Sequence, residues 1–152
     1  MSRKLSRDDA DRILTGMQPS GSDATDGGTL GRFVAAMEPL AGALEISDDD
    51  PRVVAIARAI AEAPNDRIVV THGTDTMTDT ARVLRSIRGK TIVLTGALSP
   101  ARFANTDAAF NVGMAFAAVQ ALPAGVYITM NGQVFDAAKV RKDHATNRFV
   151  PV

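Results

Sequence analysis

Short apolar runs alternate with segments of helical periodicity along the second half of the chain. The runs at 67–71, 91–95 and 126–130 are rich in Val, Ile and Thr, which predicts buried strands. Between them, apolar residues recur at helical spacing over 77–87 and 107–122. Continuous apolar strands separated by helices are typical of parallel sheets. We therefore expect an α/β fold: a three-layer parallel sheet with helices on both faces.

The first third of the chain has a weaker pattern. Residues 6–16 predict a helix, and 18–28 predict a loop because they lack apolar periodicity. Residues 33–44 predict a helix that is interrupted near Pro39. A clearer helix begins at Asp48-Asp49-Asp50-Pro51, since acidic residues and proline both suit a first turn.

Length and composition narrow the class of protein. The chain of 152 residues fits one domain, and we expect 1–47 to be its atypical part and 48–150 its regular core. Lys plus Arg and Asp plus Glu both number 17, so net charge gives no reason to expect a nucleic-acid or membrane partner. Cysteine is absent, and no cluster of His, Asp and Glu has metal-ligand spacing, so we expect neither metal nor other cofactor. Without an apolar leader or spanning segment, a cytoplasmic location is expected.

Candidate chemistry concentrates directly after the first predicted strand. His72, Gly73, Thr74, Asp75 and Thr76 occupy the turn between that strand and the next helix. Open parallel sheets bind ligands at the carboxyl ends of their strands, and the following helix directs free amide groups to the same place. This turn therefore predicts a ligand site.

Each of these polar residues also has a structural interpretation. Thr76 or Thr78 could cap the following helix, with Asp79 completing a partial capping box, and Asp75 could be a cap as well. His72 could be a hydrogen-bonded core histidine or a proton-transfer group. His144 lies in a charged segment where solvation is expected, and Lys142 belongs to a mixed-charge run, Lys139–Asp143, that is normally solvated.

The string Thr71–Ala81 closely resembles the second threonine signature of bacterial-type L-asparaginases, which hydrolyse asparagine to aspartate and ammonia. The similarity extends over residues 66–149 in the family's order and spacing. Ala101-Arg102-Phe103 and an early end near Arg148 resemble the short, single-domain members. The other matching segments are Thr95–Pro100, Thr106–Asn111, Met130–Gly132, Asp136 and Val140–Lys142.

The resemblance implies roles for particular residues. Thr74 would be one of two catalytic threonines, Asp75 would hold the substrate α-ammonium, and Lys142 would accept the proton of Thr74. Gly73 and Ala97 would line the substrate site together with Thr74 and Asp75. The family's first motif, Thr-Gly-Gly-Thr-Ile after an apolar strand, is matched poorly, because the nearest string is Asp26–Leu30. Thr29 is therefore the candidate for the other catalytic threonine, although the residues before it cannot form a buried strand.

These observations leave alternative functions open. The first is an L-asparaginase whose small-molecule substrate is L-asparagine, with some activity on L-glutamine. The second is a catalytically impaired relative that binds a small amino acid or another protein. A third is an unrelated domain that binds phosphate at 71–76, although no glycine-rich phosphate loop with lysine is present. The segment 107–122 is apolar almost all round, which predicts a homo-oligomer, as the resemblance also does.

Overall fold

The computed structural model describes residues 34–36, 48–99 and 105–152. Its main sheet has five strands in chain order, of which the first four are parallel and the last is antiparallel. Two further strands form a separate antiparallel hairpin. The strands are β1 (Val34–Ala36), β2 (Arg67–Thr71), β3 (Thr91–Thr95), β4 (Gly125–Met130), β5 (Gln133–Asp136), β6 (Val140–Asp143) and β7 (Arg148–Pro151). The helices are α2 (Pro51–Glu62), α3 (Met77–Leu84) and α4 (Ala108–Ala121).

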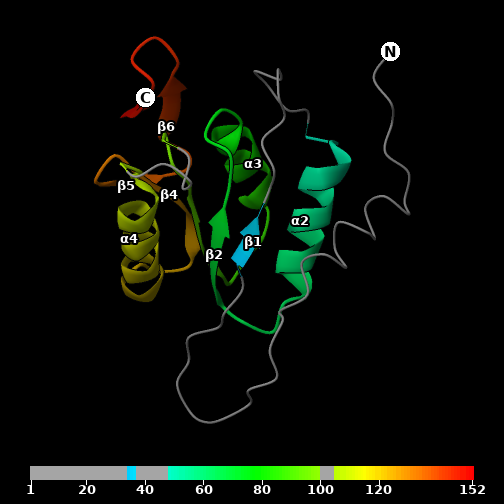
Figure 1. The fold of residues 1–152 in the computed structure, drawn as a ribbon. Helices are drawn as coiled ribbons and strands as arrows, with labels where there is room; N and C mark the ends of the chain where they lie inside the picture. The colour runs from blue at the N-terminus through cyan, green and yellow to red at the C-terminus, as the bar shows by residue number, and fades with distance from the viewer. Residues whose placement is uncertain (1–33, 37–47, 100–104) are drawn as a thin grey trace.

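Helices cover both faces of the sheet, as the sequence predicts. In Figure 1, α4 lies on one side, and α2 and α3 lie on the other. Val69 and Val93 pack with the α4 side chains Ala115, Ala118 and Val119. Neighbouring strand residues point the opposite way and pack with α2 and α3; they are Ile68, Val70, Ile92 and Leu94. This alternation divides the apolar core into two parts, one on each face of the sheet.

Local sequence signals explain where the elements begin and turn. Asp50 caps α2 by accepting a hydrogen bond from the backbone N–H of Arg52, and Pro51 occupies the first turn, where its missing N–H costs nothing. Asn131 and Gly132 join β4 to β5 with positive φ angles of 55° and 74°. A two-residue hairpin turn with both residues in this region is the type that Asn-Gly favours.

The structure corrects several expectations. The helix expected over 33–44 is wrong at 34–36, because these residues form β1 and pair in parallel with β2. Pairing with a buried neighbouring strand here outweighs the weak local helical pattern. The strand β5 and the hairpin β6–β7 were not expected. The expected helix at 6–16, the loop at 18–28 and Thr29 lie outside the described residues.

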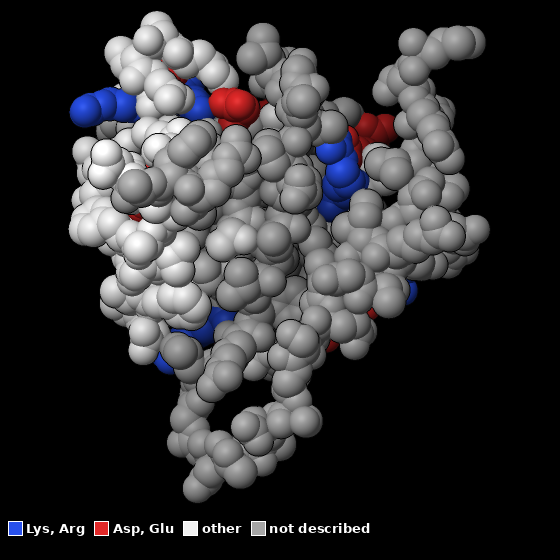
Figure 2. Space-filling view, viewed as in Figure 1, with Lys and Arg blue, Asp and Glu red and all other residues white. Residues whose placement is uncertain are grey.

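The described surface carries charges of both signs. On the face in Figure 2, acidic and basic side chains appear in small, separate groups. This agrees with the formal net charge of zero. Within the described ranges, no helix is long and apolar enough to cross a membrane.

Candidate active site

The candidate site lies at the carboxyl end of the parallel strands. Residues 72–76 connect β2 to α3, and the β6–β7 hairpin lies at this same end of the sheet (Figure 1). Asn131, in the turn after β4, ties the hairpin down because its Oδ1 accepts a hydrogen bond from the backbone N–H of Phe149 at 3.0 Å. The hairpin therefore places side chains of β6 and β7 next to the turn after β2.

Lys142 is the side chain that the hairpin delivers. Its Nζ donates to Thr74 Oγ1 and to Asp75 Oδ1, in both cases at 2.8 Å. The Lys142 side chain is only 3% exposed, whereas that of Asp75 is 60% exposed. The Phe149 ring centroid lies 5.9 Å from Nζ, within the range of a cation–π contact. A buried amine thus contacts a hydroxyl and a carboxylate that remains open to solvent.

The loop after β3 lies against this cluster. A Cβ placed on Gly96 would lie 3.4 Å from the methyl group of Thr74. Asn111 fixes the loop because its Nδ2 donates to Gly96 O at 2.9 Å and to Asp107 Oδ2 at 2.7 Å. Asp107 accepts hydrogen bonds from the backbone N–H groups of Leu98 and Ser99. The start of α4 therefore holds both ends of the segment 96–99.

The environment of Asp107 shows how strongly this loop is bound to its carboxylate. Partial burial would raise the pKa of Asp107, but hydrogen bonds from the backbone of Ser99 and Leu98 and from Asn111 outweigh it, so the pKa is lowered. Sequence reasoning matched Asp107 and Asn111 to the resemblance without assigning them a role. The available signal was an Asp and an Asn four positions apart at a helix start, directly after a candidate loop.

His72 is a buried, hydrogen-bonded side chain, which agrees with its structural interpretation. Its Nδ1 lies 2.6 Å from Gly73 O and its Nε2 lies 2.8 Å from Thr80 Oγ1. Because a carbonyl only accepts, Nδ1 of the neutral ring must donate, and Nε2 then accepts from the Thr80 hydroxyl. Burial is the main reason that the pKa of His72 is lowered. His72 therefore positions the carbonyl next to Thr74 while remaining neutral.

The lowered pKa of His72 predicts that the folded protein loses stability in mild acid. The unfolded chain binds this proton near pH 6.5, whereas the folded protein binds it only at lower pH. The contribution of the His72 pKa shift to the free energy of unfolding is therefore complete above pH 6.5, and it declines as the pH falls toward the folded-state pKa. We expect urea unfolding of His72→Gln to show less loss of unfolding free energy between pH 7.5 and 5 than the unmodified chain. Equal losses in both proteins would contradict this explanation.

The remaining candidates are placed as follows. Gly73 directly precedes Thr74, and Ala97 is half-buried next to Gly96. Thr76 occupies the N-cap position of α3 but makes no side-chain capping bond, and Thr78 lies inside the helix. His144 is exposed, as expected.

Two expectations about the surroundings of the site have different outcomes. The solvated run expected at 139–143 is wrong at Val140 and Lys142, which are buried. The resemblance also led us to expect Lys142 next to Thr74, and the hydrogen bond between Lys142 Nζ and Thr74 Oγ1 is present. A cavity of about 500 Å³ near this end of the sheet is lined by Leu98, Ser99, Asn105, Asp107, Phe110, Asn111, Asn131 and Gly132. Thr74 and Lys142 do not line this particular cavity. Within the described ranges, no three His, Asp or Glu side chains come together as metal ligands would.

Comparison with known protein families identifies relatives of this chain. The family model described as "Asparaginase, N-terminal" matches residues 47–149. The glutamyl-tRNA(Gln) amidotransferase of Methanococcus vannielii has a subunit that is 38% identical over 90 residues, covering 53% of this chain and 21% of that protein. The glutaminase-asparaginase of Acinetobacter glutaminasificans is 32% identical over 112 residues, covering 66% of this chain and 34% of that protein.

A solved structure of a related protein has a similar fold. The thermostable L-asparaginase from Thermococcus kodakarensis superposes with a TM-score of 0.63 and 32% sequence identity. The match covers 70% of this chain and 34% of that one. The chain thus spans about a third or less of the length of the relatives described here. The three-layer fold expected from the sequence is that of these structural neighbours.

Proposed function

This chain belongs to the asparaginase family, and on that premise we propose that it hydrolyses the side-chain amide of L-asparagine to aspartate and ammonia. The observation that carries the proposal is the contact of Lys142 Nζ with both Thr74 Oγ1 and Asp75 Oδ1 at 2.8 Å. The names of the relatives, an amidotransferase, a glutaminase-asparaginase and an L-asparaginase, all describe chemistry of a carboxamide nitrogen.

The cluster provides a route for the proton that the reaction must move. Lys142 Nζ, once it has released a proton, accepts the hydroxyl proton of Thr74 as Thr74 Oγ1 attacks the amide carbon. Collapse of the tetrahedral intermediate returns a proton to the leaving nitrogen, which departs as ammonia. Water then cleaves the threonine ester and releases aspartate. Burial of Lys142 excludes solvent from this proton transfer.

Asp75 has the geometry to hold the α-ammonium of the substrate. Its Oδ1 is engaged by Lys142, whereas its Oδ2 has no partner among the described residues. The side chain is 60% exposed, so a ligand can reach it. The helix α3 begins shortly after Asp75, and no described side chain caps its first backbone N–H groups. These N–H groups suit the α-carboxylate of the substrate. Asp75 thus suits the α-ammonium of an amino acid, and the first turn of α3 suits its α-carboxylate.

A second candidate function is binding of a small amino acid without turnover. It is favoured by the poor match of Asp26–Leu30 to the family's first motif. Ammonia release by the purified chain, measured with L-asparagine and in parallel with L-glutamine, separates the two. Release that rises with enzyme concentration supports hydrolysis. Saturable binding of L-aspartate that requires Asp75, with no ammonia released, selects the binding function instead.

Thr29→Val tests whether the first motif contributes. We expect this change to leave ammonia release unchanged, because the residues before Thr29 do not supply the apolar strand that holds the family's first motif. Thr25→Val, in the same segment, is the matched control. Loss of activity in Thr29→Val alone would show that Thr29 is the second catalytic threonine, and that Thr74 is not sufficient as the nucleophile.

We also propose that the chain forms a homo-oligomer through α4 and β5. Phe110 on α4 is 62% exposed and Val134 on β5 is 45% exposed. A Cβ on Gly132, in the turn before β5, would lie 3.9 Å from the Phe110 ring. We take these two exposed apolar side chains to mark an interface. We expect light scattering at micromolar concentration to give a multiple of the 16.0 kDa chain mass, and Phe110→Ser to shift it toward the monomer. A monomeric mass for the unmodified chain would refute this.

A further inference from the structure

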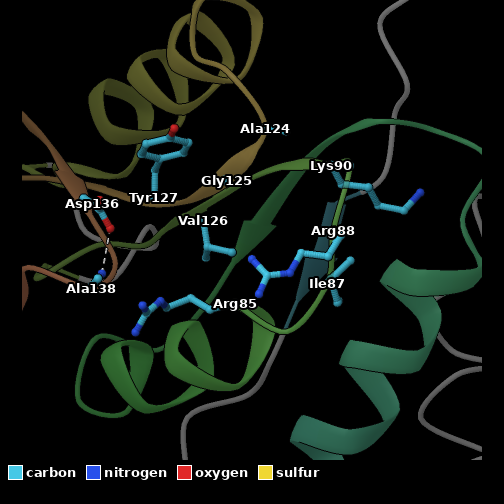
Figure 3. A pocket seen from close by; sticks show the side chains of 11 residues that line it. Arg85, Ile87, Arg88, Lys90, Ala124, Gly125, Val126, Tyr127, Asp136 and Ala138 are labelled. Carbon is cyan, nitrogen blue, oxygen red and sulfur yellow. Dashed lines mark hydrogen bonds between the residues drawn. The ribbon is translucent and has the colours of Figure 1, made fainter.

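A second cavity lies at the end of the sheet opposite to Thr74 and Lys142. It has a volume of about 270 Å³ and lies where β3 and β4 begin, next to the turn between α3 and β3. Figure 3 shows the side chains around it, which come from the α3–β3 connection, β4 and the end of β5. The lining residues that matter here are Arg85, Arg88, Lys90, Val126 and Asp136.

The cavity is rich in positive charge although the chain as a whole has none in excess. Three of its lining side chains are cationic, and Asp136 is the single carboxylate among the described lining residues. Lys90 Nζ donates to the carbonyls of Ala63 and Asn65, at 2.6 and 2.8 Å. These neutral acceptors position Lys90 without neutralising its charge. Oδ1 of Asp136 accepts from the backbone N–H of Ala138. With three cationic side chains and one carboxylate, the described lining carries more positive than negative charge.

The two arginines of the cavity differ from the arginines of the neighbouring helices. Arg52, Arg58 and Arg82, on α2 and α3, each form an ion pair with a carboxylate. Arg85 and Arg88 form no such pair with any residue that the structure describes. In Figure 3 the Arg88 side chain extends into the space in front of Val126, and that of Arg85 extends toward Asp136 and Ala138. Guanidinium groups bind planar and tetrahedral oxyanions through paired hydrogen bonds.

We propose that this cavity binds a small oxyanion of the carboxylate or phosphate type, held by Arg85 and Arg88. Ile87 and Val126 provide an apolar wall for the rest of the ligand, and the fixed charge of Lys90 adds long-range attraction. Gly89 adopts a φ of 75°, a left-handed conformation that turns the backbone sharply between Arg88 and Lys90. The site is separate from the amide-hydrolysing cluster, so it can be occupied together with it.

Two probes distinguish the ligand classes. The ¹⁵N-labelled full chain is titrated with potassium phosphate and, separately, with sodium succinate at constant ionic strength. Succinate carries carboxylates but lacks the ammonium group that Asp75 is proposed to recognise. We expect saturable shifts of the Gly89 and Gly125 amide signals with at least one probe, and little change at Thr74. The probe that produces the response identifies the class of anion.

The decisive comparison is the double variant Arg85→Gln/Arg88→Gln. Both side chains are exposed, so the variant should fold, which its unshifted core amide signals verify. We expect its affinity for the responding probe to fall about tenfold or more, because two charge-assisted contacts are lost. Arg58→Gln, on the outer surface of α2, is the matched control and should bind as the unmodified chain does. Failure of both probes to give saturable shifts at Gly89 and Gly125 would overturn the proposal, as would undiminished binding by the double variant.

Discussion

Thr74→Val is expected to abolish ammonia release from L-asparagine while leaving the fold intact, because valine keeps the shape of threonine but removes the hydroxyl. Lys142→Met should have nearly the same effect, since it removes the amine that contacts Thr74 Oγ1 at 2.8 Å. When two residues act as one catalytic unit, removing either one removes the function of both. We therefore expect each single change to lower the rate of ammonia release on the order of 10⁴-fold. The double variant should be no worse than either one.

Matched controls separate this loss from a general disturbance. Thr78 lies in the first turn of α3, directly after the turn that carries Thr74, and Lys139 lies just before β6, the strand that carries Lys142. Neither Thr78 nor Lys139 belongs to the cluster, so Thr78→Val and Lys139→Met are the controls. Both controls should keep full activity in the ammonia assay. Additive losses in the double variant would contradict a shared proton-transfer unit, and retained activity in Thr74→Val would place the nucleophile elsewhere.

Gly96→Ala is expected to destabilise the protein and disrupt the site together. A Cβ at this position would lie 2.3 Å from the backbone oxygen of His72, a contact that no real Cβ makes. The two strand ends cannot simply separate, because the His72 N–H donates to Thr95 O at 2.8 Å. We expect a loss of about 1–3 kcal/mol in the free energy of unfolding, measured with urea, and a marked loss of activity.

Gly113→Ala is the control for this substitution. A Cβ on Gly113, in the exposed middle of α4, meets nothing within 4 Å outside its own helix. Alanine there should raise the free energy of unfolding by about 0.5–1 kcal/mol, since glycine is costly inside helices. If Gly96→Ala were as stable as the unmodified chain, the close packing of the β2 and β3 ends would not constrain the site as described.

The part of the fold that follows simple periodicity could be predicted from the sequence. The strands β2 and β3 have the expected bounds, β4 begins one residue earlier than expected, and α4 is one residue shorter than expected at each end. The helix α3 ends at Leu84, three residues earlier than expected, because Arg85, Ser86 and Ile87 bond to carbonyls three residues before them. Tighter turns of this kind at a helix end leave no mark in apolar spacing.

The elements that sequence reasoning missed are those whose buried side is carried by few or unusual residues. In β5 only Phe135 is buried, so alternation has too few members to be recognised. In β6, Val140 and Lys142 are buried while Arg141 is exposed, which is a strand pattern. It was hidden because its inward residue is a lysine, and lysine is almost never buried without a partner.

The candidate site could be predicted only in part, because one of its contacts depends on an element that the sequence pattern does not show. The position of the turn 72–76 follows from the strand and helix around it. The contact between Lys142 and Thr74 depends on a hairpin that periodicity does not show, so only the resemblance pointed to it. The clamp of Asp107 and Asn111 on residues 96–99 depends on how α4 packs against the end of β3, which local sequence does not specify.

The place of Lys142 in the chain has a consequence for the stage of synthesis at which the proposed activity would first arise. The contact with Thr74 joins residues 68 positions apart, and closing so long a loop is slow compared with local folding. Chains fold progressively as they emerge from the ribosome. We expect a chain arrested at residue 139 to show the circular dichroism of the sheet and to release no ammonia. The parallel strands and Thr74 would then form first, and the chemistry would begin only when the β6–β7 hairpin docks.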